Sequence, residues 1–222
     1  MKRLSTTLAI LLVAAFAASP MLVQAQMGAP KEKSEVAKLI EAAMASNIRS
    51  ADERARDAKE RKPVETLEFF GLQPNMTVVE LMPSGGWYTK ILAPVLAEKG
   101  KLIVAVGGAR LAPKLLEWKL DKVEAQDGKF EFRPSGQYGV GEIDAMESPI
   151  TGADMVLTFR NMHNFTPAAR AKINATVFGM LKPGGIFGVV DHTRRHMEPG
   201  AVENWRRIDP VVVIQEASAA GF

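Results

Sequence analysis

Two hydrophobic patterns alternate along most of this chain. Apolar residues three and four positions apart predict amphipathic helices, while short β-branched runs predict buried strands. The predicted strands are residues 77–82, 101–106, 129–133, 154–159 and 185–191, and the predicted helices are residues 34–46, 63–70, 88–99, 112–123, 166–181 and 209–222. This order predicts an α/β fold, a Rossmann-like doubly wound, mainly parallel sheet with helices on its faces.

The first 25 residues have the layout of a secretory signal peptide. Lys2 and Arg3 precede an apolar stretch at residues 8–18, and small residues stand at Val23 and Ala25. An apolar stretch of this length is too short to span roughly 30 Å of hydrocarbon, whereas it suits a signal peptide. We expect cleavage after Ala25, no membrane attachment afterwards, and a periplasmic or secreted protein.

The rest of the chain divides into an N-terminal helical segment, residues 26–62, and a larger domain, residues 63–222. The first of these is charge-dense at residues 47–61, where Arg54, Asp57 and Arg61 either fold over a pocket as a lid or form ion pairs on the surface. We favour the surface ion pairs, because solvated charge runs are common.

The predicted sheet has no strand after its last helix. A doubly wound sheet ordinarily continues with another strand after the helix at residues 209–222. The C-terminal strands are therefore expected to be missing: either the chain is a truncated product, or the sheet has five strands and an exposed edge that something must cover.

Charge and cysteine content narrow the function classes. The chain has a formal net charge of +3, which falls to +1 when Lys2 and Arg3 leave with the leader. Because this charge is so small, it gives no reason to expect a nucleic acid partner, and we expect a small-molecule substrate. The chain has no cysteine, which excludes disulfides, thiolate metal ligands and a thiol nucleophile.

The turn after the first predicted strand is the strongest local signal. Residues 77–82 run directly into Pro83-Ser84-Gly85-Gly86 and then into a helix. Glycine permits positive φ angles and close approach of the backbone to a ligand. In open parallel sheets, this first strand-to-helix turn is where nucleotides commonly bind. The turn therefore predicts a site for a small nucleotide-like cofactor, with a plain tight turn as the alternative.

Several longer motifs accompany this turn. They are RKP at residues 61–63, FFG at 69–71, ELMPSGGWYT at 80–89, FRNMHN at 159–164 and LKPGGI at 181–186. With them, the chain from about Arg49 to Phe222 resembles class I S-adenosylmethionine-dependent methyltransferases, especially a bacterial group of exported methyltransferases.

This resemblance implies S-adenosylmethionine as the cofactor. Glu80 stands where the family keeps an acid at the end of the first strand, and Ser84, Gly85 and Gly86 would line the methionine moiety. Residues 182–185 would form the turn into the fifth strand. The full implied set of cofactor-binding residues is Glu80, Met82, Pro83, Ser84, Gly85, Gly86, Trp87, Tyr88, Gly107, Arg160 and Asn161.

One position departs from the family pattern. Class I methyltransferases usually carry Asp or Glu at the end of the second strand, where it accepts hydrogen bonds from the ribose, but here that strand runs into Gly107 and Gly108. Loss of a charged hydrogen-bond partner weakens binding by roughly 1.5–3 kcal/mol unless another group replaces it.

All three histidines follow the fourth and fifth predicted strands. We take His163 and His192 as candidate catalytic bases, because a methyl acceptor usually loses a proton and a neutral imidazole can take it. His163 is favoured since Asn161 and Asn164 flank it, although these residues could instead cap the next helix.

The loop at residues 191–196 contains further candidate groups. Arg194 and Arg195 would attract a carboxylate or phosphate, or the loop is simply solvated. Asp191, His192 and His196 would suit a metal only on a helix, so no metal is predicted.

A fold of this kind suits three functions. The first is methyl transfer from S-adenosylmethionine to an unidentified small acceptor. The second is a catalytically degenerate binding protein that keeps this fold in the periplasm, which would explain the missing ribose acid. Nicotinamide-dependent oxidoreduction is disfavoured, because the sequence lacks G-x-G-x-x-G and the acid about 20 residues beyond it.

Overall fold

The computed structural model describes residues 32–201 and 206–222. The predicted leader, residues 1–25, lies outside the described residues. From Ser34 onwards the chain forms one compact unit. Among the described residues, no helix combines the length and the apolar character needed to cross a bilayer.

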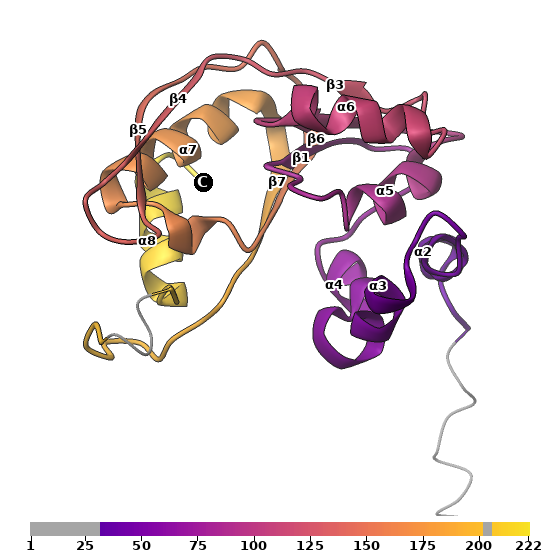
Figure 1. Cartoon of the computed structure of the whole chain (residues 1–222), viewed down its shortest axis with the longest axis horizontal. Coiled ribbons are helices and arrows are strands. Elements are labelled where there is room, and N and C mark those ends of the chain that lie inside the picture. The colour runs from indigo at the N-terminus through magenta and orange to yellow at the C-terminus, as the bar shows by residue number, and fades with distance from the viewer. Residues whose placement is uncertain (1–31, 202–205) are drawn as a thin grey trace, which may run out of the picture. The chain divides into compact units, whose positions relative to one another are not determined.

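A five-stranded sheet lies at the centre of this unit (Figure 1). Its strands follow the order β3-β2-β1-β6-β7, and every pairing is parallel. The bounds are β1 Thr77–Leu81, β2 Lys101–Ala105, β3 Glu124–Ala125, β6 Ala153–Phe159 and β7 Leu181–Val190. The predicted Rossmann-like α/β fold with a mainly parallel sheet is therefore confirmed.

Helices cover both faces of the sheet. They are α5 Thr89–Leu96, α6 Gly108–Glu117, α7 Pro167–Met180 and α8 Pro210–Ala219. Side chains alternate between faces along a strand, so Val78 packs with the α5 residues Ile91 and Leu92, while Val79 packs with Ile173 and Val177 of α7. Helices α7 and α8 lie next to each other on one side of the sheet (Figure 1).

The third predicted strand is placed wrongly. Residues 129–133 do not join the parallel sheet, because β4 Phe130–Pro134 pairs with β5 Gly141–Met146 as an antiparallel ribbon. The third strand of the sheet is instead the two-residue β3. The helix predicted at residues 112–123 begins earlier as well, directly after the turn that follows β2.

The predicted turn at residues 182–185 lies inside β7. The register with β6 jumps there, since Ala153 pairs with Leu181 and Met155 already pairs with Ile186. Gly184 takes a φ of 76°, which glycine adopts easily. Residues 182–185 therefore form an irregularity within β7, after which the strand pairs with β6 again. They are not a turn that precedes the strand.

The N-terminal helices pack on the α5 side of the sheet. They are α2 Glu35–Met44, α3 Ala51–Arg56, the π-helical turn η1 Asp57–Arg61 and α4 Pro63–Phe69. Serine side chains accept backbone N–H bonds at the starts of α2 and α3, and α3 has a full capping box. Ile40 of α2 and Leu67 of α4 are completely buried in the same core as α5.

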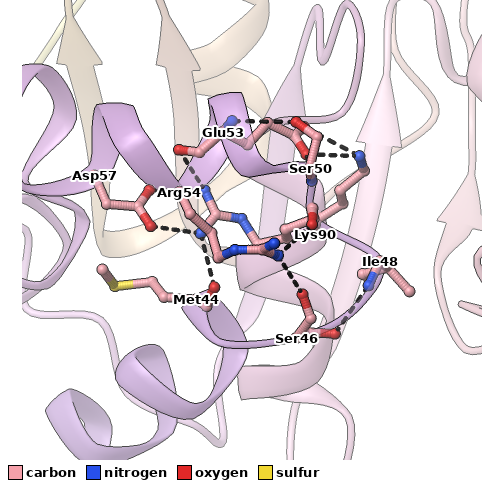
Figure 2. A network of polar contacts seen from close by, with 9 residues as sticks. Met44, Ser46, Ile48, Ser50, Glu53, Arg54, Asp57 and Lys90 are labelled. Atoms are coloured by element: carbon pink, nitrogen blue, oxygen red, sulfur yellow. Dashed lines mark hydrogen bonds and ion pairs between the residues drawn. The ribbon is translucent and has the colours of Figure 1, made fainter.

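The prediction of surface ion pairs in this segment is wrong for Asp57. Its carboxylate forms two 2.7 Å bonds with the guanidinium of Arg49, and both side chains are buried. Figure 2 shows the surrounding polar network, in which Glu53 also pairs with Lys90 of α5 at 3.0 Å. The Arg49–Asp57 bonds hold the segment together internally, and the Glu53–Lys90 pair links it to α5.

Candidate functional site

The sheet reverses its strand order between β1 and β6, which is where ligands bind in open α/β sheets. Three neighbouring strands end there in a residue with left-handed backbone: Met82 after β1, φ 53°; Val106 after β2, φ 57°; and Arg160 after β6, φ 63°. This conformation is costly for residues other than glycine, above all for a β-branched residue such as Val106. Such strain persists mainly at functional sites.

A cavity of about 590 Å³ opens at this edge of the sheet. It receives side chains from the ends of β1, β6 and β7 and from the N-terminal segment. Its walls are Arg61, Glu80, Met82, Pro83, Ser84, Gly85, Trp87, Tyr88, Phe159, Arg160, Asn161, His163, Asn164, His192, Arg206 and Arg207. The cavity thus brings together every predicted site residue except Gly86 and Gly107. We call it the central cavity.

Glu80 is the most perturbed acid at the site. It is 2% exposed and accepts a 2.5 Å hydrogen bond from the Thr89 hydroxyl. Burial raises the pKa of Glu80 to about 8, although the Thr89 bond acts in the opposite direction. The carboxyl group is therefore largely protonated at pH 7, and a cation that entered the cavity would favour its ionisation.

The two glycines of the turn have different surroundings. Gly85 lies on the central cavity, and a Cβ atom built there would meet nothing within 4 Å. Gly86 has a φ of 77°, and a Cβ there would lie 2.8 Å from the Trp118 ring. Gly86 is thus explained by backbone conformation and packing, and its predicted contact with the methionine moiety has no counterpart among the cavity walls.

Gly107 lines a smaller cavity of about 270 Å³, beside the central one and sharing Met82, Ser84 and Asn161 with it. No acid follows β2 directly. However, Asp127, which follows β3, reaches the same turn and accepts N–H bonds of 2.9–3.0 Å from residues 107–109. An acid is therefore present near this position, and the start of α6 holds its carboxylate.

Aromatic rings and arginines form the outer wall of the central cavity. The guanidinium groups of Arg49 and Arg61 lie 4.7 and 4.8 Å from the centre of the Trp87 ring, within cation–π distance. Tyr88 stacks on Phe159 with 3.5 Å between ring centres. Arg61, predicted to be a lid residue or a surface ion pair, therefore lies in the cavity wall.

His163 forms a buried pair with Asp191. The imidazole Nδ1 bonds to one Asp191 oxygen, and the other oxygen accepts the His163 backbone N–H at 3.0 Å. A carboxylate at Nδ1 favours the tautomer with its lone pair on Nε2. Arg206 Nη2 lies 3.4 Å from Nε2 and donates to Asn164 at 2.6 Å. The pair has the arrangement of a general base oriented by a carboxylate.

The other histidines are arranged differently. Arg160 Nε donates to His192 Nε2 at 2.8 Å, so the hydrogen bond occupies that lone pair. Burial, followed by the charges of Arg160 and His163, lowers the pKa of His192. His196 pairs with Asp209 at 2.9 Å. No group of three or more His, Asp or Glu side chains suited to a metal occurs within residues 32–201 and 206–222.

The asparagines do not cap α7. Thr166 has that role, since its hydroxyl accepts the Ala169 N–H. The Asn161 amide donates to the Thr158 hydroxyl at 2.9 Å and to the Leu81 and Met82 carbonyls at 3.4 Å. It therefore ties the ends of β1 and β6 together at the floor of the site.

Sequence reasoning missed the pairing partner of His163 and two arginines of the site. The sequence suggested Asp191 only as part of its own loop. In the structure β6 and β7 are neighbours, so Asp191, which follows β7, lies beside His163, which follows β6. Arg206 and Arg207 belong to no motif, and nothing in the sequence singled them out.

No family model matches this sequence. Over 125 residues, 56% of the chain, it is 28% identical to an uncharacterized methyltransferase of Synechocystis sp.. The matched stretch covers 51% of that protein, so the chain spans about half the length of the curated relative that it matches.

Solved methyltransferase structures share the fold. A SAM-dependent methyltransferase from Aquifex aeolicus superimposes with a TM-score of 0.57 at 16% identity, over 85% of this chain and 89% of that one. Human N-acetylserotonin methyltransferase, solved in complex with SAM, gives 0.52 at 14% identity, over 84% and 51%. These likenesses confirm the predicted resemblance in fold to class I methyltransferases, while the resemblance to an exported subgroup stays a prediction.

Proposed function

We propose that this protein is an S-adenosylmethionine-dependent methyltransferase that acts on a small molecule. The observation that carries the proposal is that a buried acid, Glu80, and a carboxylate-oriented base, His163, face one cavity at the strand reversal of a methyltransferase fold.

The residues present fit this cofactor. Glu80 offers a carboxyl group to the cationic amino group, and Gly85 leaves open space beside it. The Trp87 indole N–H is buried with no hydrogen-bond partner among the described residues, and Trp87 lines the same cavity, so the N–H can donate to a ligand. The smaller cavity beside Gly107 has apolar walls, including Phe130 and Phe132, suited to a nucleobase.

When bound, S-adenosylmethionine would supply an electrophilic methyl group. The protein's own part is to position the acceptor and to remove its proton. The lone pair of His163 Nε2, which Arg206 contacts only at 3.4 Å, accepts that proton when the acceptor takes the place of this contact, and Asp191 stabilises the resulting imidazolium through Nδ1. The stacked Tyr88 and Phe159 rings form an aromatic part of the wall of the same cavity.

Calorimetry with S-adenosylmethionine and S-adenosylhomocysteine tests the cofactor proposal. We expect saturable binding of both, and no detectable heat at millimolar ligand would refute the proposal. Glu80→Gln should weaken binding by about 10- to 100-fold, the usual loss for a charged hydrogen bond. Glu117→Gln, on the exposed face of α6, is the matched control and should bind normally.

The catalytic role of His163 is tested through Asp191. Asp191→Asn removes the carboxylate that orients the base, so methyl transfer should slow by about 10²–10⁴-fold while the S-adenosylhomocysteine affinity is retained. Normal transfer in this variant would contradict the assignment. The alternative function, a catalytically degenerate binding protein, predicts cofactor binding without release of S-adenosylhomocysteine for any small acceptor tested with the unaltered protein.

We also propose that the protein is exported through residues 1–25. The charged start and short apolar stretch of the sequence support this. Mass spectrometry of the protein from the periplasm of an expressing bacterium should give a chain that begins at Gln26. A chain that keeps Met1 and stays in the cytoplasm would overturn this proposal.

A further inference from the structure

A second, larger cavity adjoins the central one. Its volume is about 870 Å³, and it lies between the loop after β4, the start of α7 and described residues from 194–201 and 207–212. His163 and Arg207 line both cavities. The proposed base therefore lies in the wall of both cavities, and we call the second one the acceptor cavity.

Among the described wall residues of the acceptor cavity, arginines outnumber acids. Asp209 is its acidic wall residue, and its carboxylate already accepts bonds from His196, Met197 N and Val211 N. Arg170 also lines it, but its guanidinium is neutralised by Glu216 through two bonds of 2.6 and 2.7 Å.

Two other arginines in the wall have no such counter-charge within residues 32–201 and 206–222. Among the described residues, Arg194 Nε is buried with no hydrogen-bond partner, and Arg207 donates only to the Thr193 carbonyl, at 3.4 Å. Neither forms an ion pair with a carboxylate of the described chain. A buried guanidinium nitrogen without a partner is costly, and an anionic ligand would satisfy it.

Much of the remaining wall is apolar, although Gln137, Tyr138 and Thr166 also line it. Val140, Phe165, Pro167, Ile208 and Val212 face the cavity from four different segments. A ligand held here therefore places an apolar body against these side chains and an anionic group near Arg194 and Arg207. A hydroxyl group of the same ligand would have to reach His163 to be methylated.

We propose that the methyl acceptor is a hydroxylated organic acid with an apolar body, bound in the acceptor cavity by Arg194 and Arg207. This rests on the proposed methyltransferase function. It also separates the two neighbouring arginines that the sequence suggested as a pair, because Arg194 lines the cavity and Arg195 does not.

Calorimetry on protein saturated with S-adenosylhomocysteine tests the proposal. The probes are 4-hydroxycinnamate and 3-hydroxyoctanoate, each compared with its uncharged amide. We expect at least one acid to bind about tenfold or more tightly than its amide, in line with a charge-assisted bond. Arg194→Gln should remove this preference while the S-adenosylhomocysteine affinity stays unchanged, and Arg195→Gln should keep it.

The outcomes separate the two proposals. If S-adenosylhomocysteine itself does not bind, the methyltransferase function fails. If it binds but neither acid is preferred over its amide, or if Arg195→Gln loses the preference as strongly as Arg194→Gln, only the acceptor proposal fails. Thermal melts should show both variants folded, because the Arg194 side chain has no bond within the described structure whose loss would weaken the fold.

Discussion

Glu80→Gln should make the protein more stable at neutral pH while it impairs cofactor binding. The buried carboxyl has a pKa of about 8, against an ordinary value of 4.5. Between these two values the folded protein keeps a proton that the unfolded chain has lost. Stability therefore falls as pH rises through this window, and glutamine, which resembles the protonated acid and does not titrate, escapes the loss.

The size of the effect follows from the shift. Each pKa unit corresponds to 1.36 kcal/mol, so at pH 7 the variant should exceed the unaltered protein by about 3 kcal/mol in free energy of unfolding. At pH 5 the difference should be below about 1 kcal/mol, because this pH is only slightly above the ordinary pKa, so ionisation stabilises the unfolded chain only weakly.

Urea denaturation at pH 5, 6, 7 and 8 measures this difference, with Glu117→Gln as the control that should track the unaltered protein. The reasoning is refuted if Glu80→Gln is no more stable at pH 7 than at pH 5 relative to the unaltered protein. Stabilisation combined with weaker S-adenosylhomocysteine binding would show that Glu80 is kept for its ligand rather than for the fold.

Two further predictions concern the fold around the site. Asp57→Asn should lower the free energy of unfolding by about 3–5 kcal/mol in urea denaturation, because it leaves the buried Arg49 without its counter-charge. Gly86→Ala should lower it by about 1–3 kcal/mol, since its Cβ would clash with the Trp118 ring at a backbone angle that alanine disfavours.

Each of these has a matched control in the same chain. Glu35→Gln breaks an ion pair with Lys99 that is more than half exposed, so its effect should stay within about 1 kcal/mol. Gly85→Ala should leave stability within about 0.5 kcal/mol, because its Cβ meets only open space. Equal losses in a variant and its control would contradict the packing argument.

Much of the fold could be predicted because periodicity and burial are local signals. The apolar runs at β1, β2 and β6 are short, β-branched and buried on both faces, so their pattern has one reading. β3 could not be predicted in this way, because it has only two residues, Glu124 and Ala125, and both are exposed. Its strand character comes from pairing with β2.

The sequence predicted where the candidate site lies, but not which of its side chains form hydrogen bonds with one another. Parallel strands bring their carboxyl ends to one edge, so the sequence placed Glu80, the glycine turn and His163 together. Which side chains pair there depends on the order of the strands across the sheet. β6 and β7 are neighbours, and this alone brings Asp191 to His163.

The sequence by itself determined the alternation of helices and strands, the glycine turn after the first strand and the absence of an acid directly after the second. Tertiary structure decided what those features mean. It supplied Asp127 from another strand, buried the Arg49–Asp57 pair and distinguished Arg194 from Arg195. Local sequence patterns fix backbone conformation. Burial, charge pairing and cavities arise where residues distant in the chain pack together, so only the tertiary structure could show them.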